Sequence, residues 1–133
     1  MNTLPAELPS DGTEAFTGLV CPECLGNLVV RVQHRHVTFV CRIGHAFSIG
    51  ELTTSKEAVV EERMWMAVFA YEELQALLTD LGRHQLTDGN SLEACRTRAT
   101  LARRQAALLR SVIEADRSLS ENVPGWGGGK ASP

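Results

Sequence analysis

Aromatic residues are scarce in this 133-residue chain, at 5% of the sequence, and no segment approaches the roughly 18 consecutive apolar residues of a membrane span. The first ten residues contain no basic stretch followed by an apolar run, so we expect no secretory signal. The net charge of −3 lacks the excess of positive charge that a generally nucleic-acid-coating protein needs. These absences favour a small cytoplasmic protein.

Proline, glycine and acidic residues without periodicity occupy the first part of the chain, and a glycine-rich run lies near its end. We expect a flexible N-terminal tail over 1–17 and a disordered C-terminal tail over 119–133. The part between them must form the folded core. A core of this size gains stability from a metal ion that links distant parts of the chain.

Four residues form two pairs with the spacing of zinc ligands. Cys21 and Cys24 stand in Cys-Pro-Glu-Cys, and Cys41 and His45 stand in Cys-Arg-Ile-Gly-His. Each pair can lie on a tight turn, and the residues between the pairs can form two strands. Three thiolates and one imidazole complete a tetrahedron around Zn²⁺ and leave no position for a reactive water. We therefore predict a structural zinc ion.

Three other residues compete with His45 for the fourth ligand position. His34 and His36 are expected at the opposite end of the hairpin, whereas Gly44 can supply the turn that a Cys-x3-His pair needs. Cys95 falls on an apolar helical stripe, where a small buried side chain is sufficient. We favour His45 and keep the other three as alternatives.

No catalytic residues are predicted. Glu23 invites comparison with the glutamate of zinc deaminases, but that chemistry requires a His-x-Glu sequence ahead of Pro-Cys-x-x-Cys, and no histidine precedes Cys21. We interpret Glu23 as a solvated turn residue. No Ser/His/Asp set, phosphate-binding loop or pair of carboxylates indicates another active site.

The hydrophobic pattern predicts a small α+β fold. Runs rich in β-branched residues at 27–33 and 36–40 flank a turn and indicate a zinc-ribbon-like hairpin within 18–49, with 47–49 as a short additional strand. From Ser48 onward the apolar period changes from two to about 3.6. A long antiparallel two-helix hairpin is therefore expected over 50–118.

Helix boundaries are marked by polar capping patterns. Ser48-x-x-Glu51 and Thr54-x-x-Glu57 can both open the first helix, with a break near Thr53, and Gly82 can end it. Asn90-x-x-Glu93 can open the second.

Each predicted helix carries one apolar stripe with alternating steps of three and four residues. These stripes are Val60, Met64, Ala67, Tyr71, Leu74, Leu78 and Leu81 in the first helix, and Leu92, Cys95, Ala99, Ala102, Ala106, Leu109 and Ile113 in the second. The first helix is mainly acidic and the second carries six arginines, so opposite charges favour their pairing.

Further apolar residues lie outside the two stripes. Intramolecular packing could cover them, but a two-helix hairpin has little interior, so we also consider them a candidate partner surface that favours a homodimer. They are Trp65, Met66, Val68 and Phe69 in the first helix and Leu101, Leu108 and Val112 in the second.

Three segments together resemble a known bacterial domain. They are 18–28 around Cys-Pro-Glu-Cys, 39–48 with Cys-Arg-Ile-Gly-His-Ala-Phe-Ser, and 60–67 followed by Glu72-Glu73-Leu74. The chain is similar here to the cysteine-rich C-terminal domain attached to some chemotaxis-type protein-glutamate methylesterases. The resemblance implies that Cys21, Cys24, Cys41 and His45 match that family's metal ligands. The esterase domain has no counterpart in these residues.

The expected function is a non-enzymatic, zinc-stabilised protein-interaction or regulatory module, linked through the resemblance to chemotaxis-type signalling. Its expected partner is a protein or a second copy of the chain. The alternative is a nucleic-acid-binding regulator that uses the zinc hairpin and the arginine-rich second helix, although the acidic first helix and the net charge weigh against it.

Overall fold

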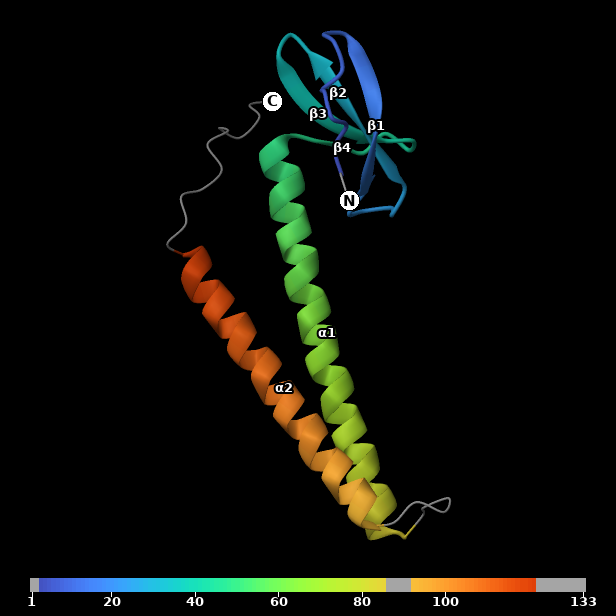
Figure 1. The fold of residues 1–133 in the computed structure, drawn as a ribbon, viewed down its shortest axis with the longest axis vertical. Helices are drawn as coiled ribbons and strands as arrows, with labels where there is room; N and C mark the ends of the chain where they lie inside the picture. Colours follow the sequence, from blue (N-terminus) through green and yellow to red (C-terminus); the bar gives the residue numbers. More distant parts are fainter. Residues whose placement is uncertain (1–2, 86–91, 122–133) are drawn as a thin grey trace. The chain divides into compact units, whose positions relative to one another are not determined.

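The computed structural model describes residues 3–85 and 92–121 and has a small α+β fold, as predicted (Figure 1). Four strands precede two helices: β1 (Thr13–Val20), β2 (Asn27–Gln33), β3 (His36–Cys41), β4 (Ala46–Phe47), α1 (Ile49–Arg83) and α2 (Leu92–Ser120). The described residues up to Val59 form one compact unit, and those from Val60 onward form another.

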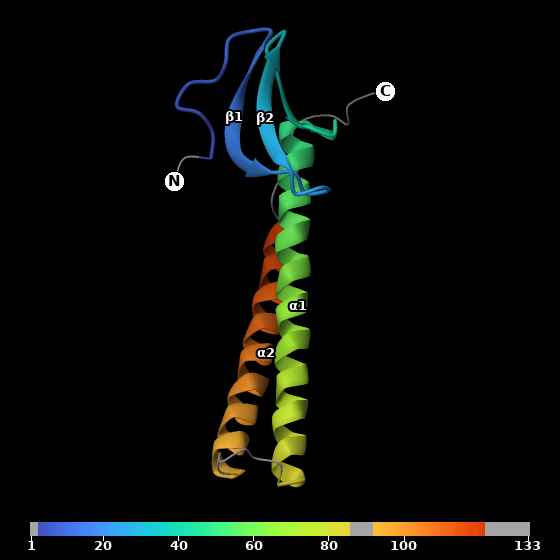
Figure 2. The same cartoon turned by 90° about the vertical axis from the view of Figure 1, so that its right-hand side faces the viewer.

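The first unit is an antiparallel sheet with strand order β1-β2-β3-β4 (Figure 1). Figure 2 shows β1 beside β2. Strands β2 and β3 form the predicted hairpin, in which Gln33 pairs with His36 around a two-residue turn. Both turn residues, His34 and Arg35, have positive φ values of 51° and 65°. In a two-residue hairpin turn, positive φ values at both central residues give the turn a twist that matches the twist of the flanking strands.

The expectation of a flexible tail over 1–17 is wrong from Thr13 onward, because β1 begins there. Phe16 pairs with Val29, and the buried Thr17 hydroxyl donates to the Leu28 carbonyl oxygen at 2.7 Å. The register shifts between Phe16 and Val20. This irregularity interrupts the alternation of side chains that would mark the segment as a strand.

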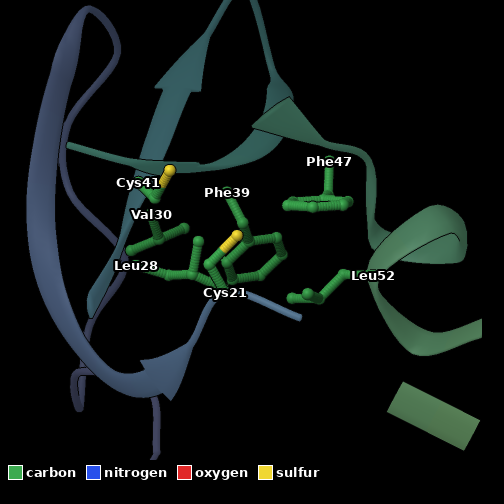
Figure 3. Close-up of a cluster of buried hydrophobic side chains, with 7 residues drawn as sticks. All are labelled: Cys21, Leu28, Val30, Phe39, Cys41, Phe47 and Leu52. Atoms are coloured by element: carbon green, nitrogen blue, oxygen red, sulfur yellow. The ribbon is translucent and has the colours of Figure 1, made fainter. Parts of the chain in front are cut away.

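The core of the first unit contains the inward-facing side chains of β2 and β3. Alternation in the strands buries one face and leaves the residues between them less covered. The buried cluster is Cys21, Leu28, Val30, Phe39, Cys41, Phe47 and Leu52 (Figure 3). Two of the four candidate ligands, Cys21 and Cys41, therefore belong to this core, and Cys24 packs against it. Leu52, in the first turn of α1, packs in the same core and so anchors the start of the helix to the sheet.

Helix α1 begins with the Ser48-x-x-Glu51 capping box. The Glu51 amide donates to Ser48 Oγ at 3.1 Å, and the Ser48 amide donates to the Glu51 carboxylate at 3.4 Å. The strand expected at 47–49 lies instead at Ala46–Phe47, since Ser48 is the cap. The helix continues through Thr53 without the break considered above. Lys56 Nζ donates to the Val20 carbonyl oxygen, which joins the helix to the end of β1.

The prediction that Gly82 ends the helix is wrong. Gly82 lies within α1, and the chain leaves the helix after Arg83 with a positive φ of 54° at Gln85. A Cβ atom on Gly82 would lie 4.0 Å from Cys95 Cβ, so this glycine lies beside α2. The Asn90 capping box lies outside the described residues.

The second unit is the predicted antiparallel pair of helices. Its buried cluster contains Val68, Ala106 and Ile113, with Met64, Trp65, Tyr71 and Leu109 packed against it. The predicted stripe of α2 is buried or partly buried along its length. The stripe of α1 is only partly used, because the contact centres on Val68 and leaves Val60 and Leu74 57% and 42% exposed.

Helix α2 extends through Ser120, so the boundary of the C-terminal tail at 119 is wrong by two residues. The remainder of that predicted tail, 122–133, lies outside the described residues. Within the part of the chain that the structure describes, neither helix is apolar enough over a sufficient length to cross a membrane.

Candidate metal centre

The first ligand pair lies on a tight turn directly after β1. The Leu25 amide donates to the Cys21 carbonyl oxygen at 2.9 Å, and the Cys21 amide donates to the Gly26 carbonyl oxygen at 2.7 Å. Leu25 has a positive φ of 62°. A Cβ atom on Gly26 would lie 3.3 Å from Cys24 Sγ, so a glycine lets the chain return close to the thiol.

The second pair lies on a matching turn after β3. The Gly44 amide donates to the Cys41 carbonyl oxygen at 3.1 Å, and the Cys41 amide donates to the His45 carbonyl oxygen at 3.0 Å. Gly44 has a φ of 107°, a conformation that side chains disfavour, so the predicted role of this glycine in the turn is confirmed. The turn also brings the His45 amide to 3.3 Å from Cys41 Sγ.

The two turns bring four ligand atoms to within 4.8 Å of one another, an arrangement that can hold a metal ion. Cys24 Sγ lies 3.7 Å from Cys41 Sγ, and His45 Nδ1 lies 3.6 Å from Cys21 Sγ and 3.3 Å from Cys41 Sγ. In a zinc tetrahedron with ordinary bond lengths, neighbouring sulfurs are about 3.8 Å apart, and sulfur and nitrogen about 3.5 Å. The observed separations are close to these edges.

The protein environment acts in opposite directions on two of the thiols. Burial opposes ionisation of Cys41, but the backbone amides of residues 43–45 and the Cys24 side chain outweigh it and lower its pKa to about 6. The Gly26 amide favours the Cys24 thiolate, but burial and the neighbouring Cys41 and Cys21 side chains together raise the pKa of Cys24. Several thiolates cannot share this space unless a cation compensates their charge.

Glu23 belongs to the site, which sequence reasoning missed. A Glu23 carboxylate oxygen lies 3.0 Å from His45 Nε2, on the side of the ring away from the thiols. An Nε2–H that donates to this carboxylate leaves the Nδ1 lone pair directed at the sulfurs, as a metal-binding histidine requires. No local sequence signal brings Glu23 to His45, because the two residues lie on different turns, more than twenty residues apart in the chain.

The alternatives to His45 lie elsewhere. His34 and His36 are at the β2–β3 turn, and neither belongs to the cluster of ligand atoms. Cys95 is buried in the helical unit next to Gly82, where it packs as predicted.

The candidate partner surface needs one correction. Val68 is fully buried between the helices, because it faces Ala106 and Ile113, so it cannot contact a partner. Trp65 is half-buried: it stacks on Phe69 with ring centroids 6.0 Å apart. The other predicted surface residues, Met66, Phe69, Leu101, Leu108 and Val112, are all more than half exposed.

Comparison with known proteins identifies no relative. No family model matches the chain, and neither the curated proteins nor the solved structures contain a significant match.

Proposed function

We propose that this protein is a non-enzymatic, zinc-stabilised protein-interaction module. The observation that carries the proposal is the cluster of ligand atoms of Cys21, Cys24, Cys41 and His45 within 4.8 Å of one another, in which three of the six separations, at 3.3–3.7 Å, are close to the edges of a zinc tetrahedron. Mg²⁺ and Ca²⁺ are poor candidates for this site, because they are hard ions that prefer oxygen ligands to thiolates. The cytoplasm suits this donor set, since thiols stay reduced there.

The four protein ligands would serve structure and not catalysis. They fill all four positions of the usual zinc tetrahedron, whereas a catalytic zinc keeps one position for water or substrate. The ion would join the turn after β1 to the turn after β3, which lie far apart in the sequence. In a core as small as this one, such a link contributes a large part of the folding free energy.

The interaction role rests on the helices. Met66 and Phe69 on α1, and Leu101, Leu108 and Val112 on α2, are exposed apolar side chains at helical spacing. Such exposed apolar side chains on both helices are candidates for a surface that another protein covers. The resemblance of the 39–48 segment to the methylesterase-attached domain extends the proposal to regulation in chemotaxis-type signalling.

The test compares cysteine variants inside and outside the site. Cys41→Ser and His45→Ala should each lose zinc and unfold the sheet, as seen in the zinc content of the purified protein and in amide NMR signals from residues 13–56. Cys95→Ser is the matched control, because Cys95 is equally buried but lies outside the cluster. It should retain one zinc ion per chain. A folded sheet without zinc in either site variant would refute the proposal.

A further inference from the structure

Arginines recur along one side of α2 at intervals of seven residues. Because seven residues are about two helical turns, their side chains form a row along the helix, which consists of Arg96, Arg103, Arg110 and Arg117. Arg117 donates to Glu61, and Arg110 donates to Glu72. Both guanidinium groups also lie over the Trp65 ring, at 5.8 Å and 5.5 Å from its centroid. Ion pairs and cation–π contacts therefore engage this half of the row.

The other half of the row lacks acidic partners. In the part of the chain that the structure describes, neither Arg96 nor Arg103 forms an ion pair. The helices run in opposite directions, so seven residues forward from Glu72 in α1 and seven back from Arg110 in α2 reach facing positions again. These positions hold Thr79 and Arg103. A neutral hydroxyl therefore stands where the pattern of the row places a carboxylate.

The two unpaired arginines line a groove between α1 and α2, together with Arg83 of α1. The groove has a volume of about 600 Å³, which is typical of a small-molecule site. Leu78 and the buried Ala99 give it an apolar part, and none of the described residues that line it is acidic. Asp80 pairs with Arg83 at 3.0 Å, but both side chains are more than half exposed, so this ion pair is weak. The groove therefore carries an excess of positive charge.

The hydrogen-bond donors of the groove are mainly guanidinium groups. The Thr79 hydroxyl already donates to the Gln75 carbonyl oxygen at 2.8 Å, and the Thr100 hydroxyl donates to the Arg96 carbonyl oxygen at 3.0 Å. Guanidinium groups bind carboxylates and phosphates. A phosphate group offers three acceptor oxygens and up to two negative charges, so it can accept from two guanidinium groups at once.

Two of the arginines reach the groove from opposite walls. A Cβ atom on Gly82 would lie 4.0 Å from Cys95 Cβ, so the two helices are close at this level. Arg83 and Arg96 are the next residues, one on each helix, and both line the groove. This arrangement suits a phosphate better than a carboxylate, because a single guanidinium group can already engage both oxygens of a carboxylate.

We propose that this groove binds a small molecule that carries two or more phosphate groups and an apolar part, as a nucleoside triphosphate does. Its phosphate groups accept hydrogen bonds from Arg83, Arg96 and Arg103, and its apolar part packs against Leu78 and Ala99. The inference goes beyond the function proposed above. It does not rest on the metal centre, so a result on one of the two sites leaves the other unaffected.

The first test is isothermal titration calorimetry of the purified protein with ATP, without magnesium and at about 0.15 M salt. We expect saturable binding of one ATP per chain. Arg96→Gln and Arg103→Gln should each weaken it by about 10-fold, because each removes a hydrogen bond between charged groups. Arg98→Gln is the matched control, since Arg98 is an exposed arginine of α2 that does not line the groove. It should bind ATP as the wild type does.

The same titrations contain the outcomes that would overturn the inference. One is the absence of saturation at about 1 mM ATP, and another is an equal loss of affinity in Arg98→Gln and Arg103→Gln. Citrate, a tricarboxylate, and a short single-stranded RNA should both bind more weakly than ATP. Tighter binding of citrate would assign the groove to carboxylates, and tighter binding of RNA would assign it to nucleic acid. Either result would refute a small phosphate ligand.

The second test supplies the missing acidic partner of Arg103. Thr79→Glu places a carboxylate opposite Arg103, as Glu72 lies opposite Arg110. It should weaken ATP binding by about 10-fold and leave the helical circular dichroism unchanged. Thr54→Glu is the matched control, because Thr54 is an exposed threonine near the start of α1, and it should not change the affinity for ATP. A folded Thr79→Glu protein with wild-type affinity would contradict a phosphate site at Arg103.

Discussion

A carboxylate oxygen of Glu23 lies 3.0 Å from His45 Nε2, while the other ring nitrogen faces the thiols of Cys21 and Cys41. The carboxylate therefore orients the imidazole and increases its basicity, which strengthens a bond from Nδ1 to a metal ion.

Replacing Glu23 by Gln should weaken zinc binding by about 10- to 100-fold without abolishing it. Competition with a chromophoric chelator measures the affinity. Glu14→Gln is the control, because Glu14 is an exposed glutamate of the same unit that pairs with Arg31 away from the site. Equal zinc affinities for the two variants would show that the carboxylate near His45 has no effect on the metal.

The Val68→Ala substitution should destabilise the helical unit by about 1–3 kcal/mol, since it leaves a cavity between α1 and α2. Met66→Ala removes a side chain that is 62% exposed, and it should change the free energy of unfolding much less. Urea denaturation followed by circular dichroism gives both values. Similar losses for the two variants would mean that Val68 is not at the centre of the contact.

Gly82→Ala should stabilise α1 by about 0.5–1 kcal/mol, because Gly82 has a helical conformation and an added methyl group makes an ordinary contact with Cys95. A glycine that ended the helix in a left-handed conformation would give the opposite sign. The melting temperature of the variant therefore distinguishes a residue inside the helix from a helix stop. A lower melting temperature would contradict the structure.

Nucleic acid should bind weakly or not at all. Two of the six arginines of α2, Arg110 and Arg117, are engaged by Glu72 and Glu61, which reduces the positive field available for phosphates. Fluorescence anisotropy with labelled single-stranded and duplex DNA and RNA, at low and at physiological salt, tests this expectation. Tight binding that falls steeply as salt increases would support the alternative function.

Local sequence spacing predicted the metal cluster and the capped start of α1. The two members of each ligand pair are three residues apart (Cys21 and Cys24) or four residues apart (Cys41 and His45), so their geometry follows from a few backbone conformations, including those of Leu25 and Gly44. The Ser48 cap is likewise formed within four residues.

Features that depend on distant contacts were not predictable in this way. Strand β1 was missed because its pairing with β2, and the irregularity after Phe16, do not appear in the local pattern. The orientation of α1 was missed because it carries apolar residues on several faces, and only the fit of Val68 against Ala106 and Ile113 selects one of them. Glu23 required the position of His45, more than twenty residues away.

The most direct test of the zinc-stabilised module is X-ray absorption spectroscopy at the zinc edge on the purified protein. The proposed zinc site predicts a first shell of three sulfur atoms at about 2.3 Å and one nitrogen atom at about 2.0–2.1 Å. A shell in which a water oxygen replaces one of these ligands would contradict the closed site and, with it, the assignment of a structural and non-catalytic metal.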